Sequence, residues 1–495
     1  MALIPLPGWA VISLEASFTA SGWGQTASSG GTITGPAPLY VFFDSVGSTS
    51  TNVTSGKEFG EMGFHFDFGY ATPSTPGTWP ISGKPKGEEI GGPLAGHVYE
   101  TPGTYVASVR VQDATGAYKD VYVTIVAVDP SVYWSVGQGR SSVNVNVADG
   151  AWPTWASDTR YVLQAGGSFS SFGNININAV NRIFIDGGTG TKPTISGLTV
   201  ETATGTTSRA WSQCGIYKNL SSPTGAFEAQ LPSAYHLLID SNFGHFSNAT
   251  GLPGKYNTAA DQTNWYFPRY HCIQNGVFTA DDGTSAGYVT AGWWDMMSRF
   301  SLLGIEAHCE QNGTNMEHAV RSMGSYKVFI AHSYFHTPGT LNGPKHFLTI
   351  RSKGSDVFQE YLTGTPYSDT KRAEQVVVQF CKFGKSTDTG HTWPFQFGYR
   401  YSPGATDPAA RNQILTYGRT QGCTWVVTLD LPSNGLQMIG NYIWDLNTSV
   451  WRGSGYDTGD ASSLYKNIYS NNAGTPDNNY LFAAPPLVNP NKAGT

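Results

Sequence analysis

The chain of 495 residues has little charge and few cysteines for its length. Only 13% of its residues are charged, the net charge is −6, and no basic stripe is present. A nucleic-acid partner is therefore not expected, because such partners are bound by clustered Lys and Arg. The cysteines form no CxxC and no Cys/His metal spacing, which predicts buried thiols rather than a disulfide framework or a metal centre. They are Cys214, Cys272, Cys309, Cys381 and Cys423.

Long apolar runs are also missing. No stretch reaches the roughly 18 apolar residues that cross a bilayer, so no membrane span is expected. The N-terminus lacks the basic start of a secretory signal, and Pro5, Pro7 and Glu15 interrupt its apolar run. We expect a virion surface or extracellular location, reached either by loss of a leader or by release as part of a virion.

Glycine and aromatic residues are abundant instead. The chain holds 59 Gly, and 13% of its residues are aromatic, which favours β-structure with many tight turns. The length exceeds one compact core and predicts two or more units. Residues 1–32 start apolar and become rich in Gly, Ser and Thr. This segment is expected to be an arm that docks on another chain, or else a strand of the next domain.

Residues 33–130 predict a small antiparallel sandwich. Phe64, Phe66 and Phe68 alternate with polar residues, and similar alternation returns over 105–111 and 121–127. Pro102-Gly103 marks a turn between such strands.

This segment resembles the PKD family of immunoglobulin-like domains. The motifs that carry the resemblance are Phe42-Phe43-Asp44-Ser45, Phe66-Asp67-Phe68-Gly69 and His97-Val98-Tyr99-Glu100-Thr101-Pro102-Gly103-Thr104-Tyr105. Tyr70 and a long insertion over 71–96 depart from the family pattern. The resemblance implies a spacer or adhesive module without catalytic activity.

The next residues carry apolar runs that are repeatedly closed by Gly or Asn. Examples are Arg182-Ile183-Phe184-Ile185-Asp186 and Lys327-Val328-Phe329-Ile330-Ala331. Self-similar strands at irregular spacing are typical of a β-solenoid, and Asn suits its corners. We expect a linker and cap over 131–160, a parallel β-helix over 161–485 and a tail over 486–495. The pattern resembles right-handed parallel β-helix proteins, the group of pectate-lyase-like enzymes and phage tailspikes. The predicted fold class is therefore all-β, a sandwich plus a right-handed parallel β-helix.

A polar cluster before and after the strand at 327–335 is the candidate catalytic site. His318 and His346 are about one rung plus a loop apart, so they are expected to stack on one face. A base beside cations could abstract a sugar proton, which is lyase chemistry. A stacked polar ladder of purely structural role is the alternative. The candidate catalytic residues are Glu317, His318, Arg321, Lys345, His346 and Arg351.

Carboxylates and aromatics offer two further kinds of site. Glu306 and other acids could form the pair that hydrolyses glycosides, although the sequence does not pair them. No cofactor is predicted, and no motif supports a Ca²⁺ site. Aromatics in or beside predicted loops could stack on sugar rings, or could instead cover the core. The candidate carbohydrate-binding residues are Trp265, Trp293, Trp294, Trp393, Tyr399 and Tyr401.

Three functions follow from these features. The first is a structural or adhesion protein of a virion, a spike or fibre that presents its β-helix to host glycans. It would form a homotrimer and contact other virion proteins through the N-terminal arm. The second is a secreted polysaccharide lyase or glycoside hydrolase with a PKD accessory domain. The third is a passive decoration protein, favoured if the loop aromatics are buried.

Overall fold

The computed structural model describes most residues in the first four-fifths of the chain, and only short strands in the last fifth. The described residues are 13–53, 62–70, 76–113, 115–135, 144–148, 152–178, 180–201, 212–229, 233–247, 269–280, 291–295, 297–309, 318–323, 325–336, 346–351, 374–383, 393–398, 411–416, 419–420, 427–429, 437–439, 442–443, 451–453 and 468–469. Strands dominate this part of the chain, with only a one-turn α-helix and a short 3₁₀ segment, η1 (Ser170–Phe172), besides them.

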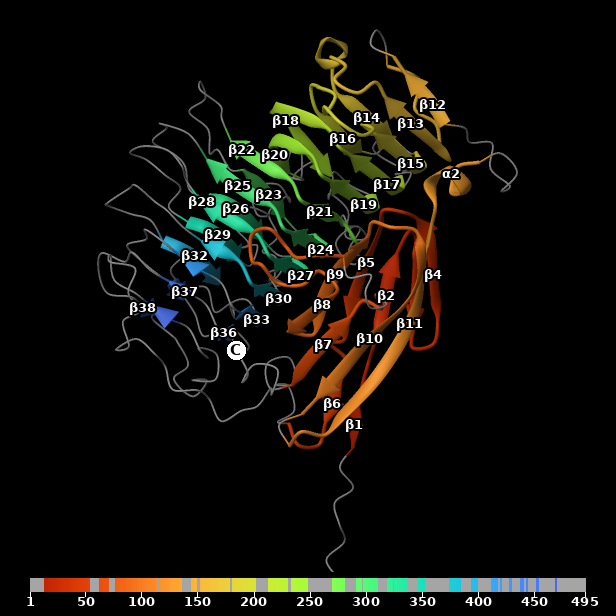
Figure 1. Cartoon of the computed structure of the whole chain (residues 1–495). Coiled ribbons are helices and arrows are strands. Elements are labelled where there is room, and N and C mark those ends of the chain that lie inside the picture. The colour runs from red at the N-terminus through yellow and green to blue at the C-terminus, as the bar shows by residue number, and fades with distance from the viewer. Residues whose placement is uncertain are drawn as a thin grey trace, which may run out of the picture.

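An N-terminal sandwich comes first (Figure 1). One sheet has four strands, in the order β3 (Gln25–Ser28), β2 (Thr19–Gly22), β5 (Leu39–Asp44) and β9 (Leu94–Tyr99). The other has five, in the order β4 (Thr32–Pro36), β11 (Tyr118–Val128), β10 (Gly103–Gln112), β7 (Gly63–Asp67) and β8 (Glu88–Gly91). A small pair is formed by β1 (Leu14–Glu15) and β6 (Thr49–Ser50), and α2 (Pro130–Tyr133) follows β11.

The predicted alternation of buried and open positions is present in the sandwich. Phe64, Phe66 and Phe68 are each 1% exposed, and the polar residues between them face outward or are half-buried. The start of the sandwich differs from the expectation of an arm over 1–32, because β2 pairs with both β3 and β5. The alternative prediction, that this segment belongs to the next domain as a strand, describes residues 19–28 correctly. The physical reason is burial: Ala20 and Ala27 lie in the core, and Phe18 just before β2 stacks on Phe43.

The sandwich contains a buried histidine, His97. The ring of His97 stacks on Phe68 at 4.2 Å, and its Nε2 lies 2.9 Å from the Tyr70 hydroxyl. Burial, with a smaller effect of the Lys86 cation, lowers the pKa of His97 to about 3. The unfolded chain binds this proton below about pH 6.5, whereas the folded chain binds it only near pH 3.

We therefore expect the sandwich to lose stability as the pH falls from about 6.5 towards 3, by up to about 1.4 kcal/mol per pH unit for this group. His97→Gln should flatten this loss. Urea unfolding of both proteins at pH 7 and pH 4.5 measures it. An equal loss in the variant and the parent would show that His97 does not carry the effect.

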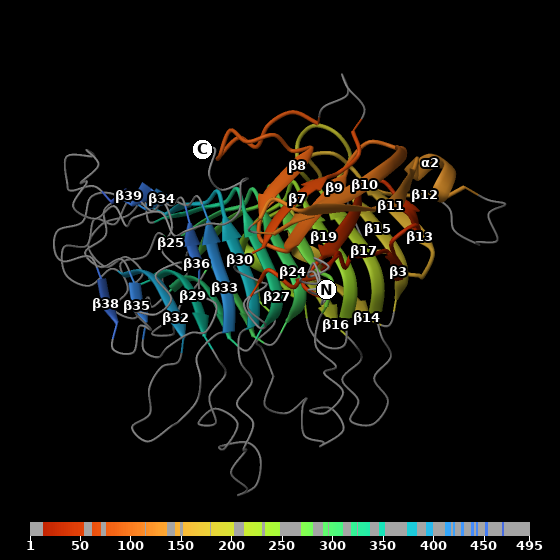
Figure 2. The same cartoon turned by 90° about the horizontal axis from the view of Figure 1, so that it is seen from below.

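The second unit is a parallel β-helix whose strands stack in rungs from β12 onwards (Figure 2). Eleven strands form one sheet: β12 (Asn144–Val147), β13 (Thr159–Leu163), β15 (Asn181–Asp186), β17 (Ser212–Lys218), β19 (Ser233–Ile239), β21 (Cys272–Gln274), β24 (Ser298–Leu303), β27 (Tyr326–Ala331), β30 (Glu374–Gln379), β33 (Arg411–Thr416) and β36 (Gln437–Ile439). β12 pairs in parallel with β13, so the stacked strands begin within the segment predicted as a linker and β-helix cap over 131–160.

The remaining solenoid strands form a second parallel sheet of seventeen strands, in which most rungs contribute two. They are β14 (Ile175–Asn178), β16 (Leu198–Glu201), β18 (Ser221–Ala229), β20 (Asn242–Ser247), β22 (Val277–Ala280), β23 (Gly292–Asp295), β25 (Glu306–Cys309), β26 (His318–Met323), β28 (Tyr334–His336), β29 (His346–Arg351), β31 (Lys382–Phe383), β32 (Trp393–Gly398), β34 (Arg419–Thr420), β35 (Val427–Leu429), β37 (Tyr442–Ile443), β38 (Trp451–Gly453) and β39 (Ile468–Tyr469). The two sheets confirm the predicted parallel β-helix.

From β15 to β30, the eleven-stranded sheet is buried on both faces. In β15, Ile183 and Ile185 point into the solenoid core, while Phe184 between them packs in the core shared with the sandwich. The same division holds in β27, where Val328 and Phe329 join different cores. A strand that is covered on both sides reads as a continuous apolar run. The uninterrupted runs of the sequence thus reflect a second layer, the sandwich, as well as the solenoid interior.

Left-handed backbone conformations recur at both ends of the strands in this sheet. The row where these strands end consists of Asn219, Asp240, Asn275, Gly304, His332 and Phe380, all with φ between 52° and 60°. The row near their starts consists of Asp158, Arg182, Cys214, Tyr235, Tyr270, Arg299 and Lys327, with φ between 54° and 62°. Asn and Asp tolerate this conformation through local hydrogen bonds, as predicted for the corners. The larger side chains in the rows were not anticipated.

Both rows lie where the sandwich is fastened to the solenoid. Near the strand starts, Lys327 forms an ion pair with Asp44, and the Tyr270 ring meets Phe42 edge-on at 6.5 Å. Between the rows, the Tyr40 hydroxyl donates to Ser301 Oγ at 2.8 Å in a buried position. The sandwich is therefore held against the solenoid along several rungs.

Another polar contact of this junction is fully buried. His332, at the end of β27, hydrogen-bonds to Glu89 in β8, and the two side chains are 1% and 2% exposed. Gln379 Nε2 donates to the second carboxylate oxygen of Glu89 at 2.5 Å. Among the described residues, no helix is long and apolar enough to cross a membrane.

Candidate functional site

The predicted polar cluster lies on two adjacent strands of the seventeen-stranded sheet. β26 and β29 pair in parallel, and their register sets residue 318 directly opposite residue 346. The same register aligns Met323 with Arg351 and Arg321 with Thr349. The sequence therefore predicted correctly that the two histidine positions stack in neighbouring rungs. Glu317 and Lys345, which precede these strands, lie outside the described residues.

Arg321 is half-buried between inward-facing neighbours. Val320 and Ser322 on either side of it are fully buried. The alternation of a strand then directs Arg321 to the outer surface. Its register partner in the preceding rung is Trp293.

One of the predicted sugar-binding aromatics is instead part of the core. Trp294 is 0% exposed, stacks on Phe246 at 5.1 Å and packs against Phe300 at 4.7 Å. The prediction was wrong for Trp294, because the strand alternation of β23 turns this ring inward. Trp293 lies in strand β23, and Trp393 lies in strand β32. Trp265, Tyr399 and Tyr401 lie outside the described residues.

A polar group beside this cluster was only partly anticipated. Glu306 in β25 and Tyr334 in β28 are register partners in adjacent rungs. His336 Nε2 lies 2.8 Å from Glu306 Oε1, and the Glu306 side chain is 42% exposed. The rings of Tyr334 and His336 stack at 4.1 Å. We call these three residues the flank cluster.

The local sequence explains how the flank cluster forms. Phe335 is fully buried in the solenoid core, so Tyr334 and His336 on either side of it point outward. Glu306 has the same relation to the buried Ala307. The sequence does contain a signal for this group. In Tyr334-Phe335-His336, polar and apolar residues alternate with a period of two, whereas the prediction treated the whole segment as one apolar run.

The flank cluster combines three polar functions that suit a hydroxyl-rich ligand. A partly exposed carboxylate accepts hydrogen bonds and orients the imidazole of His336. Burial, and then the charge of Glu306, raise the pKa of Tyr334, so its phenol stays protonated and can donate. Aromatic rings also stack on the C–H faces of sugars. Within the described part of the chain, no group of three or more His, Cys, Asp or Glu could hold a metal ion.

The described thiols are inert. Cys214, Cys272 and Cys381 are free and buried, as predicted. Burial raises the pKa of Cys214 and of Cys381 to about 12, so neither is a thiolate at neutral pH.

Fold and site together define a class: an all-β protein in which a parallel β-helix carries an N-terminal sandwich along its flank. No protein-family model matches the sequence, and no curated protein matches it. Among solved structures, the chain is similar to an exopolygalacturonase of family 28 from Yersinia enterocolitica. The TM-score is 0.28 at 9% identity, over 88% of this chain and 85% of that one. The fold class rests on the strand pairings described above.

Proposed function

We propose that this chain is a surface-displayed structural or adhesion protein that presents the flank of its β-helix to glycans. The observation that carries the proposal is the flank cluster, where the partly exposed carboxylate of Glu306 and the half-buried phenol of Tyr334 both contact the largely buried imidazole of His336 on neighbouring rungs or in one strand. The sandwich covers the outer face of the eleven-stranded sheet from β15 to β30. That face is closed to a ligand, and the seventeen-stranded sheet supplies the open surface.

The finer parts of the proposal concern assembly. A virion spike or fibre would use the solenoid as its shaft, associate as a homotrimer and attach to other virion proteins through its N-terminus. The PKD-like motifs support an adhesive module more than a spacer, because the sandwich packs along the solenoid. Light scattering of the purified protein tests the trimer directly.

Catalysis on polysaccharides is the second candidate. The stacked positions 318 and 346 favour it, and His336, oriented by Glu306, adds a described base. Incubation with acidic and neutral polysaccharides separates the possibilities. Unsaturated products indicate a lyase, and new reducing ends indicate a hydrolase. Binding without turnover supports the adhesion protein.

Glu306→Gln is expected to weaken glycan binding by about 10-fold or more, because a hydrogen bond to a charged group is worth about 1.5–3 kcal/mol. Binding to an immobilised panel of acidic and neutral polysaccharides measures this. Asp120→Asn is the matched control, since Asp120 is a partly exposed acid paired with Arg110 on the sandwich. Equal effects of the two variants, or none, would contradict a role of the flank cluster.

A further inference from the structure

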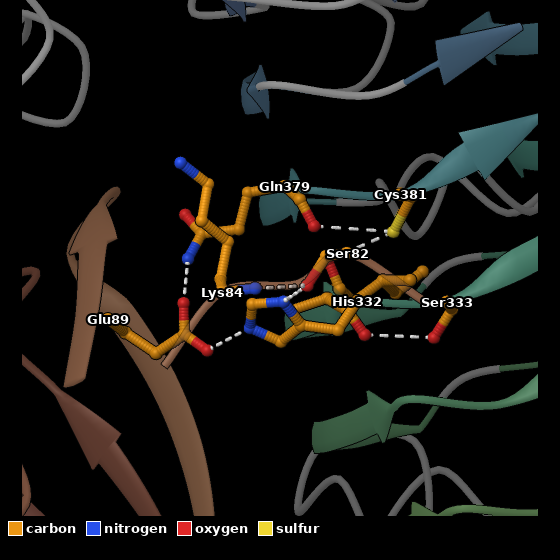
Figure 3. Close-up of polar contacts among 9 residues, drawn as sticks. Ser82, Lys84, Glu89, His332, Ser333, Gln379 and Cys381 are labelled. Atoms are coloured by element: carbon orange, nitrogen blue, oxygen red, sulfur yellow. Dashed lines mark hydrogen bonds and ion pairs between the residues drawn. The ribbon is translucent and has the colours of Figure 1, made fainter. Parts of the chain in front are cut away.

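A serine, a histidine and a glutamate form a hydrogen-bonded chain where the sandwich meets the solenoid (Figure 3). Ser82 Oγ lies 2.7 Å from His332 Nδ1, and His332 Nε2 contacts Glu89 Oε1. In the neutral tautomer that donates from Nε2 to the carboxylate, Nδ1 accepts the proton of the serine hydroxyl. This is the order of contacts that activates a serine nucleophile.

The glutamate is held in place by a second donor. Gln379 Nε2 donates to Glu89 Oε2 at 2.5 Å, so each carboxylate oxygen has a partner from a different rung. Glu89 and His332 are both buried. The orienting acid and the base are thus shielded from water, which strengthens their interaction.

Two aromatic rings fix the plane of the imidazole. Trp79 stacks on one face of His332 at 4.8 Å, and Phe380 stacks on the other at 5.4 Å. Phe380 belongs to the next rung, whereas Trp79 comes from the sandwich. It fits because Gly304 has no side chain in the corner row: a Cβ there would lie 2.9 Å from the Trp79 ring.

Ser82 itself is partly exposed, on a tight turn of the sandwich. Gly83 follows with φ of 71°, and its N–H donates to the Trp79 carbonyl. The backbone N–H of Lys84 points at Ser82 Oγ from 3.3 Å. The ammonium group of Lys84 lies 5.1 Å from the centre of the Phe380 ring. The hydroxyl of Ser82 is thus held in place by a backbone donor on one side and by His332 Nδ1 on the other.

The geometry points to a second, hydrolytic site, in which Ser82 attacks an acyl ester, His332 transfers the proton and Glu89 positions the imidazole. Ser82 Oγ bonds to the acyl carbon while its proton passes to His332 Nδ1. The C–O bond to the alcohol then breaks, and the alcohol leaves with that proton. Water attacks the acyl-serine, again deprotonated by His332, and releases the carboxylic acid and the free serine.

An O-acyl group on a carbohydrate is the substrate class that fits the surroundings. Tyr334 of the flank cluster follows His332, the partner of Ser82, by two residues, so the proposed glycan-binding surface begins at the corner that holds His332. This choice of substrate rests on the proposed function, whereas the reactivity of Ser82 towards a simple ester is independent of it.

The full-length protein is tested with p-nitrophenyl acetate and with a fluorophosphonate probe. We expect ester hydrolysis above the buffer rate and probe attachment at Ser82, located by peptide mass spectrometry. Ser82→Ala should lose probe attachment and lower the rate by about 10³-fold. Ser108→Ala, a partly exposed serine on the outer sheet of the sandwich, is the control and should change neither. For Glu89→Gln, kcat should fall while KM stays near the parent value.

Absence of probe attachment at Ser82, or equal hydrolysis by Ser82→Ala and the parent, would overturn the assignment. Acetate release from an O-acetylated polysaccharide tests the substrate class separately. Glycan binding that persists in Ser82→Ala, together with no turnover of either ester, would refute this inference and leave the proposed function standing. Ester hydrolysis without glycan binding would support this inference and refute the proposed function.

Discussion

Glu89→Ala is expected to lower the free energy of unfolding by about 3–5 kcal/mol, the cost of removing one partner from a buried ionisable pair. The substitution leaves His332 and Gln379 facing a gap with their N–H groups unsatisfied. Because these groups join the sandwich to two rungs of the solenoid, the loss should weaken the attachment of the two units. Thermal and urea unfolding of the full chain measure it.

The neighbouring residue offers a matched control. Glu88 also pairs with a histidine, His65, at 2.8 Å, but these side chains are 40% and 32% exposed. Exposed pairs of this kind contribute less than about 1 kcal/mol, so Glu88→Ala should change little. Glu89→Gln, which keeps a hydrogen-bonding side chain, should fall between the two. Equal stability of the Glu88 and Glu89 alanine variants would show that the buried pair does not fasten the sandwich.

The second large effect is expected at Trp294. Trp294→Ala should destabilise the solenoid by about 3–5 kcal/mol, because the ring is fully buried and its removal leaves a cavity against Phe246 and Phe300. Glycan binding by the remaining folded protein should be unchanged. Denaturant unfolding and binding to immobilised polysaccharides, measured on the same preparation, separate the two effects.

Tyr118→Ala is the corresponding exposed control. Its side chain is 59% exposed on the sandwich, and surface substitutions of this kind usually stay within about 0.5 kcal/mol. A Trp294 variant with full stability and weakened glycan binding would restore the original prediction that this ring meets sugars.

The contacts between the sandwich and the solenoid determine whether the two units can move independently. A spacer domain on a linker would move independently of the solenoid, but here buried polar contacts from Tyr40 and Glu89 reach separate rungs. The shared apolar core extends the contact from Phe184 to Val377. The two units should therefore unfold together, and a ligand would meet one rigid surface.

Much of the architecture followed from local pattern. Alternating Phe64, Phe66 and Phe68 predicted a half-buried strand, and the repeated apolar runs closed by Gly or Asn predicted stacked rungs. These signals are readable because strand period and turn chemistry depend on neighbours in the sequence. Even the alignment of residues 318 and 346 followed, since their separation is close to one rung plus a loop.

Other features depended on which face of each strand turned inward and on what covered it. A shift of one residue exchanges the two faces, and for this reason Trp294 was predicted at the surface while it lies in the core. Tyr334 and His336 were likewise hidden within an apolar run. Contacts across 250 residues, such as Ser82 with His332, leave no local signal at all. The sequence alone determined the strands and their repeat, whereas the tertiary structure decided the docking of the sandwich and the two candidate sites, because both depend on side chains that meet only after folding.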